Sequence, residues 1–127
     1  MGYYSDVAII LSKMAANALK VRLNDSSIPE KVRKESSRLL IFTNKHLTDA
    51  GSGSEAWYWD TIKWYVDAPE YFPEVDFMEK FLAELAESEY RFMRVGEEFD
   101  DLEVRGSYLN HPFDLTLSRS ISLTDSA

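Results

Sequence analysis

The densest run of charged side chains in this 127-residue sequence is GEEFDDLEVRG, at residues 96–106. Its carboxylates are Glu97, Glu98, Asp100, Asp101 and Glu103. A calcium loop needs carboxylates at spaced positions around a central glycine, and this run lacks both features. Two interpretations stay open: a solvated hairpin turn, and an acidic surface that binds a basic protein, such as one that normally holds nucleic acid. Metal binding is the least favoured interpretation, and we predict no metal site.

Two histidines, His46 and His111, are the candidates for acid–base catalysis. The first follows a predicted helix end, where the helix dipole favours positive charge, and the second precedes a proline in a predicted turn. The sequence contains no Gly-x-Ser-x-Gly, His-x-x-x-His or phosphate-loop motif to accompany them. We therefore predict that the protein is not an enzyme, with no catalytic residue and no cofactor.

Four arginines, Arg91, Arg94, Arg105 and Arg119, fall on the predicted C-terminal strands. The guanidinium group suits bidentate contacts to carboxylates or phosphates. We expect these arginines to pair with the many carboxylates nearby. A small anionic ligand held by the arginines is the alternative.

The elements that position these side chains alternate between strand and helix patterns. Strands are predicted over residues 3–11, 56–66, 89–95, 102–107 and 115–124, and helices over residues 12–24, 29–44 and 73–87. The last helix has the clearest apolar spacing, and the strand at 115–124 alternates apolar and polar residues as a half-exposed closing strand does. This order predicts one α+β domain over residues 1–127, with about three helices on one face of a mostly antiparallel sheet.

The segment EAWYWDTIKWYVD, residues 55–67, holds all three tryptophans of the chain. Side chains alternate along an extended strand, so the two faces of this segment can be assigned from the sequence. We predict that Ile62, Trp64 and Val66 face the helices and belong to the core. The opposite face then carries Trp57, Trp59, Thr61, Lys63 and Tyr65.

That opposite face would be a large aromatic patch if only the helices covered the sheet. We predict that Trp57 and Trp59 are at least partly exposed and bind a partner. The alternatives are packing beneath the C-terminal tail or the second helix, and a stacking platform for a base. The last is weak because Lys63 is the only cation nearby in sequence.

Charge and composition restrict the class of protein further. Residues 1–64 carry nine Lys or Arg against seven Asp or Glu, whereas residues 65–127 carry five against fifteen. This acidic balance argues against direct nucleic-acid binding. The absence of cysteine and of a long apolar run predicts a cytoplasmic protein without disulfides and without a membrane span.

Three stretches resemble small uncharacterised proteins of phages and prophages: GYYSDVAIIL, YWDTIKWY followed by PEVDFMEKFLAEL, and YRFMRVGEEFDDLEVRG. The resemblance spans most of the chain. It implies a compact, acidic accessory protein that acts by binding a host protein, including anti-defence roles such as inhibition of a CRISPR complex. It carries over no active site.

We therefore expect a phage-encoded protein that inhibits or modulates a host protein in the host cytoplasm, with no direct contact to nucleic acid or membrane. The expected partner-binding residues are Trp57, Trp59, Lys63, Tyr65, Glu97, Glu98, Asp100 and Asp101. The alternative function is binding and sequestering a small ligand, such as a nucleotide signal, between aromatic residues and arginines. A homo-oligomer is compatible with either function.

Overall fold

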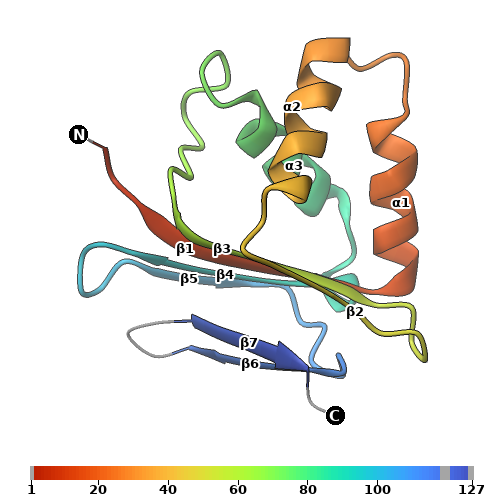
Figure 1. The fold of residues 1–127 in the computed structure, drawn as a ribbon, viewed down its shortest axis with the longest axis vertical. Helices are drawn as coiled ribbons and strands as arrows, with labels where there is room; N and C mark the ends of the chain where they lie inside the picture. The colour runs from red at the N-terminus through yellow and green to blue at the C-terminus, as the bar shows by residue number, and fades with distance from the viewer. Residues whose placement is uncertain (1, 118–120, 126–127) are drawn as a thin grey trace.

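The structure is a computed structural model that describes residues 2–117 and 121–125. Three helices lie on one face of a five-stranded sheet, and a two-stranded hairpin lies on the other face (Figure 1). Every strand pair in the sheet is antiparallel. The single α+β domain predicted from the sequence, with three helices on one face, is thus confirmed.

The sheet has the strand order β2-β3-β1-β4-β5, with the first strand of the chain at its centre. The strands are β1 (Ser5–Leu11), β2 (Lys45–Thr48), β3 (Glu55–Ile62), β4 (Tyr90–Gly96) and β5 (Leu102–Arg105), with β6 (Phe113–Leu117) and β7 (Ile121–Asp125) forming the hairpin. The helices are α1 (Lys13–Leu23), α2 (Glu30–Ile41) and α3 (Pro73–Glu84), and a 3-10 turn covers Glu87–Glu89. The short edge strand β2 was not predicted, because its four residues lack an apolar alternation.

The central strand β1 is apolar on both faces because both faces are covered. Val7, Ile9 and Leu11 join the main core beneath the helices. Ala8 and Ile10 point the other way and pack against the hairpin. A continuous apolar run is the pattern expected of a strand buried on both sides.

The helices begin where the sequence supplies starting signals. The hydroxyl of Ser12 accepts a hydrogen bond from the backbone N–H of Ala15 at 3.2 Å, which caps α1. Pro73 occupies the first turn of α3, where its missing N–H costs nothing. The inner side of α3 then contributes five buried apolar residues to the core: Val75, Phe77, Met78, Phe81 and Leu82.

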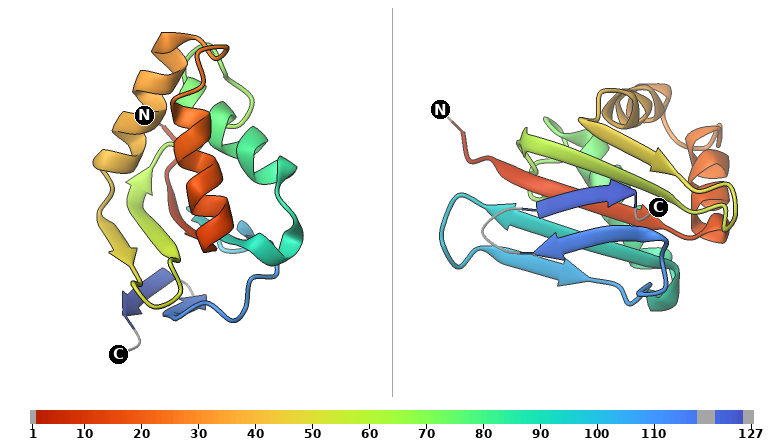
Figure 2. Two further views of the ribbon diagram at one scale, coloured as in Figure 1. Left: turned by 90° about the vertical axis from the view of Figure 1, so that its right-hand side faces the viewer. Right: turned by 60° about the horizontal axis from the view of Figure 1, so that its bottom comes forward.

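The C-terminal segment forms a hairpin rather than the single closing strand that the alternation predicted. Its strands β6 and β7 pair from Phe113 with Asp125 to Leu117 with Ile121. Phe113, Ile121 and Leu123 are buried against the second face of the sheet. Figure 2 shows this hairpin lying across the sheet. The second face is therefore covered by the chain itself.

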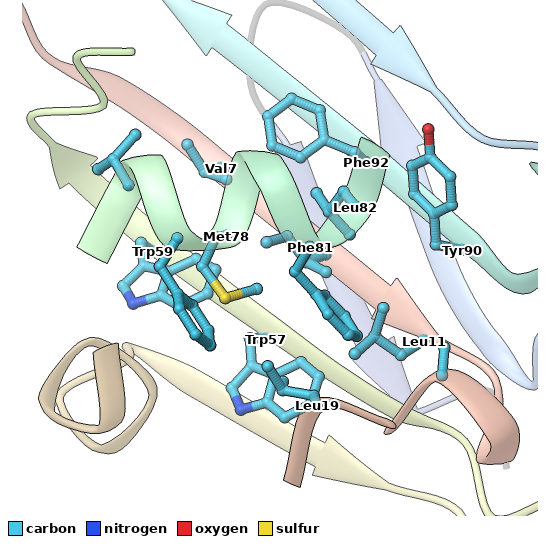
Figure 3. Packing of buried hydrophobic residues seen from close by; sticks show 14 of the residues in the cluster. Val7, Leu11, Leu19, Trp57, Trp59, Met78, Phe81, Leu82, Tyr90 and Phe92 are labelled. Atoms are coloured by element: carbon cyan, nitrogen blue, oxygen red, sulfur yellow. The ribbon is translucent and has the colours of Figure 1, made fainter. Parts of the chain in front are cut away.

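The predicted assignment of the aromatic faces is wrong for Trp57 and Trp59. Both lie in the main core beneath the helices, with exposed fractions of 5% and 2% (Figure 3). Trp64 is buried in the same cluster and Ile62 packs against it, as predicted. Val66, predicted to be in the core, is exposed.

One backbone irregularity in β3 explains why Trp57, Trp59 and Trp64 all lie beneath the helices. Thr61 has a φ of 59°, in the left-handed region. The pairing of β1 with β3 shifts there, so that two steps along β1, from Ser5 to Val7, match three steps along β3, from Ile62 to Trp59. Such a bulge reverses the parity of side chains beyond it. Trp59 and Trp64 consequently point to the same core, with ring centroids 5.9 Å apart.

Candidate binding site

An apolar cavity lies between α1, α2 and the edge of the sheet, and we call it the α1–α2 pocket. Its volume is about 420 Å³. Its lining residues are Ala16, Leu19, Lys20, Leu23, Ser37, Leu40, Ile41, Thr43, His46, Glu55 and Trp57. Small and aliphatic side chains of the two helices supply its walls. Ligand pockets generally have such apolar walls with a few polar groups, and volumes of about 300–1,000 Å³.

A stacked pair of rings forms the sheet side of the pocket. Pairing of β2 with β3 places His46 directly opposite Trp57. Their ring centroids are 4.9 Å apart and their planes differ by 7°. Trp57 is anchored in the main core on its other side, so it holds the position of His46. The pair gives the pocket a flat aromatic surface on a rigid element.

A small charged cluster borders the same pocket. Oε2 of Glu55 lies 3.3 Å from Nζ of Lys20, and Oε1 lies 3.0 Å from Nε2 of His46. An ionised carboxylate only accepts hydrogen bonds, so His46 is the donor in this contact. Each oxygen of Glu55 thus has a partner, and the cluster fixes the position of the imidazole from its edge while Trp57 fixes it from its face.

The segment that contains α1 and α2 carries positive charge within an acidic protein. Residues 13–46, which contain α1, α2 and the start of β2, carry eight Lys or Arg against three Asp or Glu, a net charge of +5. The remaining residues carry six against nineteen, a net charge of −13. Ile41, at the end of α2, is an exposed apolar side chain in the pocket lining. Of the basic side chains in this segment, Lys20 lines the pocket, where it pairs with Glu55.

The acidic run forms the connection between β4 and β5, as the hairpin interpretation predicted. Glu97, Glu98 and Asp100 are exposed, together with Phe99, whose exposed fraction is 77%. We call residues 97–100 the acidic loop. Its exposed carboxylates and its aromatic ring form one small surface of mixed character.

Asp101, predicted to be a partner-binding residue, is half-buried and already has partners within the chain. Its Oδ1 lies 2.6 Å from Nη2 of Arg94, and its Oδ2 accepts a hydrogen bond from the hydroxyl of Tyr3 at 2.6 Å. The hydrogen bonds from Arg94 and then from Tyr3 lower the pKa of this carboxyl group. Asp101 anchors the base of the acidic loop, so its charge is already neutralised.

The other predicted site residues do not form one surface. Lys63 lies over the ring of Tyr4, and the hydroxyl of Tyr65 accepts a hydrogen bond from the backbone N–H of Tyr3. Both side chains therefore hold the N-terminal segment, on the far side of the bulge from Trp57 and Trp59. The aromatic partner-binding face predicted from the sequence does not exist as a surface.

The arginines that are described are already engaged. Arg94 contacts Asp101 and Glu103, and Arg105 contacts Glu79 and Glu103. Arg91 donates a hydrogen bond to the carbonyl of Gly106 at 2.7 Å. Carboxylate pairing is thus confirmed for Arg94 and Arg105, and Arg119 lies outside the described residues. An anion site built from these arginines would have to displace existing partners.

The two histidines lie on opposite faces of the sheet. His46 borders the α1–α2 pocket, whereas the ring of His111 stacks near Phe113 of the hairpin, at a centroid distance of 6.2 Å. Burial lowers the pKa of His111. Among residues 2–117 and 121–125, no group of three or more His, Cys, Asp or Glu side chains is placed to hold a metal ion. In the same residues, no helix has the length and apolarity that crossing a membrane requires.

Sequence reasoning did not identify the α1–α2 pocket. The available signal was the run Leu39 to Phe42, four consecutive apolar residues at the end of a helix, which is more apolar surface than one buried stripe requires. The members of the Lys20–Glu55–His46 cluster come from three separate elements, α1, β3 and β2. Their meeting depends on the pairing of β2 with β3, which the sequence pattern did not predict.

Comparisons with known proteins identify no relative. No family model, no curated protein and no solved structure matches this chain. The resemblance to phage and prophage proteins therefore stays a prediction from the sequence.

Proposed function

We propose that this protein binds and sequesters a small, largely apolar molecule with a ring system in the α1–α2 pocket. The observation that supports this proposal is the combination of aliphatic walls with the stacked His46–Trp57 surface at one side of a 420 Å³ cavity. Apolar walls supply affinity through the area that they remove from water, and flat rings favour offset stacking on aromatic surfaces. The Lys20–Glu55–His46 cluster provides hydrogen-bonding groups that orient a polar substituent.

The sequence suggested a small ligand held between aromatic residues and arginines, and this proposal keeps the aromatic residues but not the arginines. The aromatic half is retained because Trp57 lines the pocket. The arginine half is dropped because Arg94 and Arg105 are paired with carboxylates. A phosphate-rich nucleotide is consequently a poor candidate, and a molecule with one polar end suits the site better.

The test is a fluorescence titration with anilinonaphthalene sulfonate as the probe. Wild type should bind it with saturation, and Ser37→Phe should reduce binding at least roughly tenfold because the new ring fills the pocket from α2. Asn17→Phe, at an exposed position of α1 outside the pocket lining, is the matched control and should bind as wild type. Denaturation curves should show that both variants are folded. Equal probe binding by folded Ser37→Phe would refute the proposed site.

A second candidate function is modulation of a host protein, in the host cytoplasm, by a phage-encoded accessory protein. The acidic loop supports it, because three exposed carboxylates surround an exposed phenyl ring. Charges of this kind steer a basic partner, and a central aromatic residue is a common energetic anchor of protein interfaces. The test compares proteins captured from host lysate by wild type and by Glu98→Gln/Asp100→Asn. A specific partner should be lost with the variant and with added salt, and capture that is indifferent to both changes would exclude the loop.

A further inference from the structure

We propose that two copies of this chain form a symmetric dimer by pairing their β5 strands edge to edge, so that the two sheets become one continuous sheet. The inference is independent of the proposed function, because the α1–α2 pocket lies at the β2 side of the sheet and β5 lies at the opposite edge (Figure 2). It assigns a partner to a surface that the pocket does not use.

The outer edge of β5 presents backbone groups for pairing. β5 is the last strand in the order β2-β3-β1-β4-β5, and no strand in the described part of the chain pairs with its outer side. On its inner side, the N–H of Gly96 donates to the carbonyl of Asp101 at 2.8 Å. Antiparallel strands exchange hydrogen bonds at every second residue pair, so this bond fixes the alternation. Glu103 and Arg105 therefore direct their backbone groups to β4, and Val104 directs its N–H and C=O groups to the outer edge.

Apolar side chains lie beside this outer edge. Val104 is opposite Met93 and Leu102 is opposite Val95, so all four lie on the face that carries the hairpin. Met93 and Val95 are buried there, whereas Leu102 and Val104 have exposed fractions of 46% and 41%. The hairpin thus buries the residues of β4 and leaves those of β5 half-exposed. An edge strand with exposed apolar residues is a template for pairing with another strand.

The charges on the other face of β5 favour a second copy as the partner and select one register. Glu103 and Arg105 lie on the side of the helices, where Arg105 is opposite Phe92 of the main core. A two-fold axis through Val104 keeps the helices of both copies on one side and places each Glu103 opposite the other copy's Arg105. An axis through Glu103 or through Arg105 would place like charges directly opposite each other, which is destabilising. The strand is therefore complementary to itself.

The ion pairs within one chain leave room for these contacts. Arg105 binds Glu79 through Nη2 at 2.7 Å and approaches Glu103 through Nε at 2.9 Å, and neither contact uses Nη1. Oε1 of Glu103 contacts Arg94, and each carboxylate oxygen has a second acceptor position. The side chain of Glu103 is 38% exposed and that of Arg105 is 29% exposed, so both are accessible from the edge. The second copy can therefore add to this network without displacing its members.

Sedimentation velocity over a wide concentration range tests the dimer. Wild type should show a monomer–dimer equilibrium without larger species, because a two-fold interface closes at two copies. Val104→Pro removes the outward N–H and should weaken dimerisation at least about tenfold, since each dimer loses two backbone hydrogen bonds. Its circular dichroism should match that of wild type, because an edge strand tolerates proline where the N–H faces solvent. Wild type that is monomeric at all concentrations, or folded Val104→Pro that dimerises as wild type, would overturn the inference.

Charge reversal tests the register. Glu103→Arg places arginines opposite arginines across the interface, and Arg105→Glu places glutamates opposite glutamates. Each variant alone should dimerise at least about tenfold more weakly than wild type, because two attractive cross-strand pairs become repulsive. An equimolar mixture of the two variants should form a heterodimer, since all cross-strand pairs are then of opposite charge. A mixture that associates no better than its components would contradict the register.

The absence of cysteine from the chain permits a test that changes no charge. The Cα atoms of directly opposite, hydrogen-bonded residues lie about 5.5 Å apart, which is within the range of a disulfide. Val104→Cys should therefore form a disulfide-linked dimer with copper phenanthroline as the oxidant, measured by non-reducing electrophoresis. Thr48→Cys, at an exposed position on the β2 edge, is the matched control and should remain monomeric. Equal cross-linking of the two variants would overturn the inference, also where the charge reversals unfold the protein.

Discussion

Replacing Trp59 with alanine should destabilise the fold about as much as any single substitution in this protein. Trp59 has an exposed fraction of 2% and packs in the main core beneath the helices. Its Nε1 donates a hydrogen bond to the backbone carbonyl of Leu39 at 2.9 Å. That carbonyl lies in the last turn of α2, where backbone acceptors have no partner within the helix. One side chain thus fills the core and completes a helix end.

The magnitude follows from these two roles. Burial of about 150–250 Å² at about 25 cal/mol per Å² gives about 4–6 kcal/mol. This is an upper estimate because the unfolded chain already buries part of that surface, and Trp→Ala substitutions in cores usually cost about 3–5 kcal/mol. We expect about 4 kcal/mol for Trp59→Ala. Trp59→Phe should cost about 2 kcal/mol, since it keeps a ring but leaves the Leu39 carbonyl without its donor.

Urea denaturation followed by circular dichroism measures both values, with Tyr71→Ala as the exposed aromatic control. The control should lie within about 0.5 kcal/mol of wild type. Trp57→Ala and Trp64→Ala should each fall near Trp59→Ala, because all three rings belong to one buried cluster. If Trp59→Ala and Trp57→Ala unfold at the midpoint of the control with unchanged denaturant slope, the rings are not in the core and the description of the bulge is wrong.

Three further predictions concern other parts of the fold. Arg94→Met should lower the unfolding free energy by about 2 kcal/mol in urea denaturation, less than the roughly 3–5 kcal/mol of a fully buried pair, because Asp101 keeps some contact with water. The lowered pKa of Asp101 stabilises the fold above about pH 4, and this contribution is lost in more acid solution. In Asp101→Asn, the unfolding free energy should therefore fall less steeply as the pH is lowered below about 4. Gly106→Ala should lower the melting temperature by several degrees, since φ is +82° there and an added Cβ would lie 2.1 Å from the carbonyl oxygen of Tyr90; a melting temperature equal to that of wild type would contradict the backbone geometry. Burial lowers the pKa of His111, so the stability that its neutral form contributes is complete above about pH 6.5 and is lost as the pH falls toward the pKa of His111 in the folded protein. Between pH 7 and pH 5, the unfolding free energy should therefore drop less in His111→Gln than in wild type. An equal drop in both proteins would assign the loss of stability to other groups.

The sequence predicted the architecture because its strongest patterns are structural. The run Val7 to Leu11 is a buried central strand, and the apolar spacing after Pro73 is a helix. The connection at residues 97–101 is a hairpin turn as predicted. The C-terminal alternation was informative about burial but not about connectivity, because two short strands, β6 and β7, share one alternating pattern and pair with each other.

The site was not predictable, because it depends on one backbone irregularity and one short strand. A period of two assigns faces only while the strand is regular, and the left-handed backbone at Thr61 reverses that assignment between Trp59 and Trp64. No residue type marks the reversal, since threonine is a common strand residue and glycine is the usual signal for a positive φ. The pocket similarly requires β2, whose pairing brings His46 onto Trp57.

The reversal also changes which surfaces are available for function. A regular strand would have placed Trp64 on the opposite face of the sheet from Trp57 and Trp59, dividing the tryptophans between two layers. The bulge gathers all three under the helices, where the hydrogen bond to Leu39 ties β3 to α2. Trp57 lies at the border of this core, where it lines the pocket with residues of α1 and α2 and stacks on His46. The packing that buries the tryptophans therefore also forms the aromatic wall of the pocket. Trp57 thus belongs both to the core and to the candidate binding site. A substitution of Trp57 should therefore change stability and probe binding together, whereas Ser37→Phe should change probe binding alone.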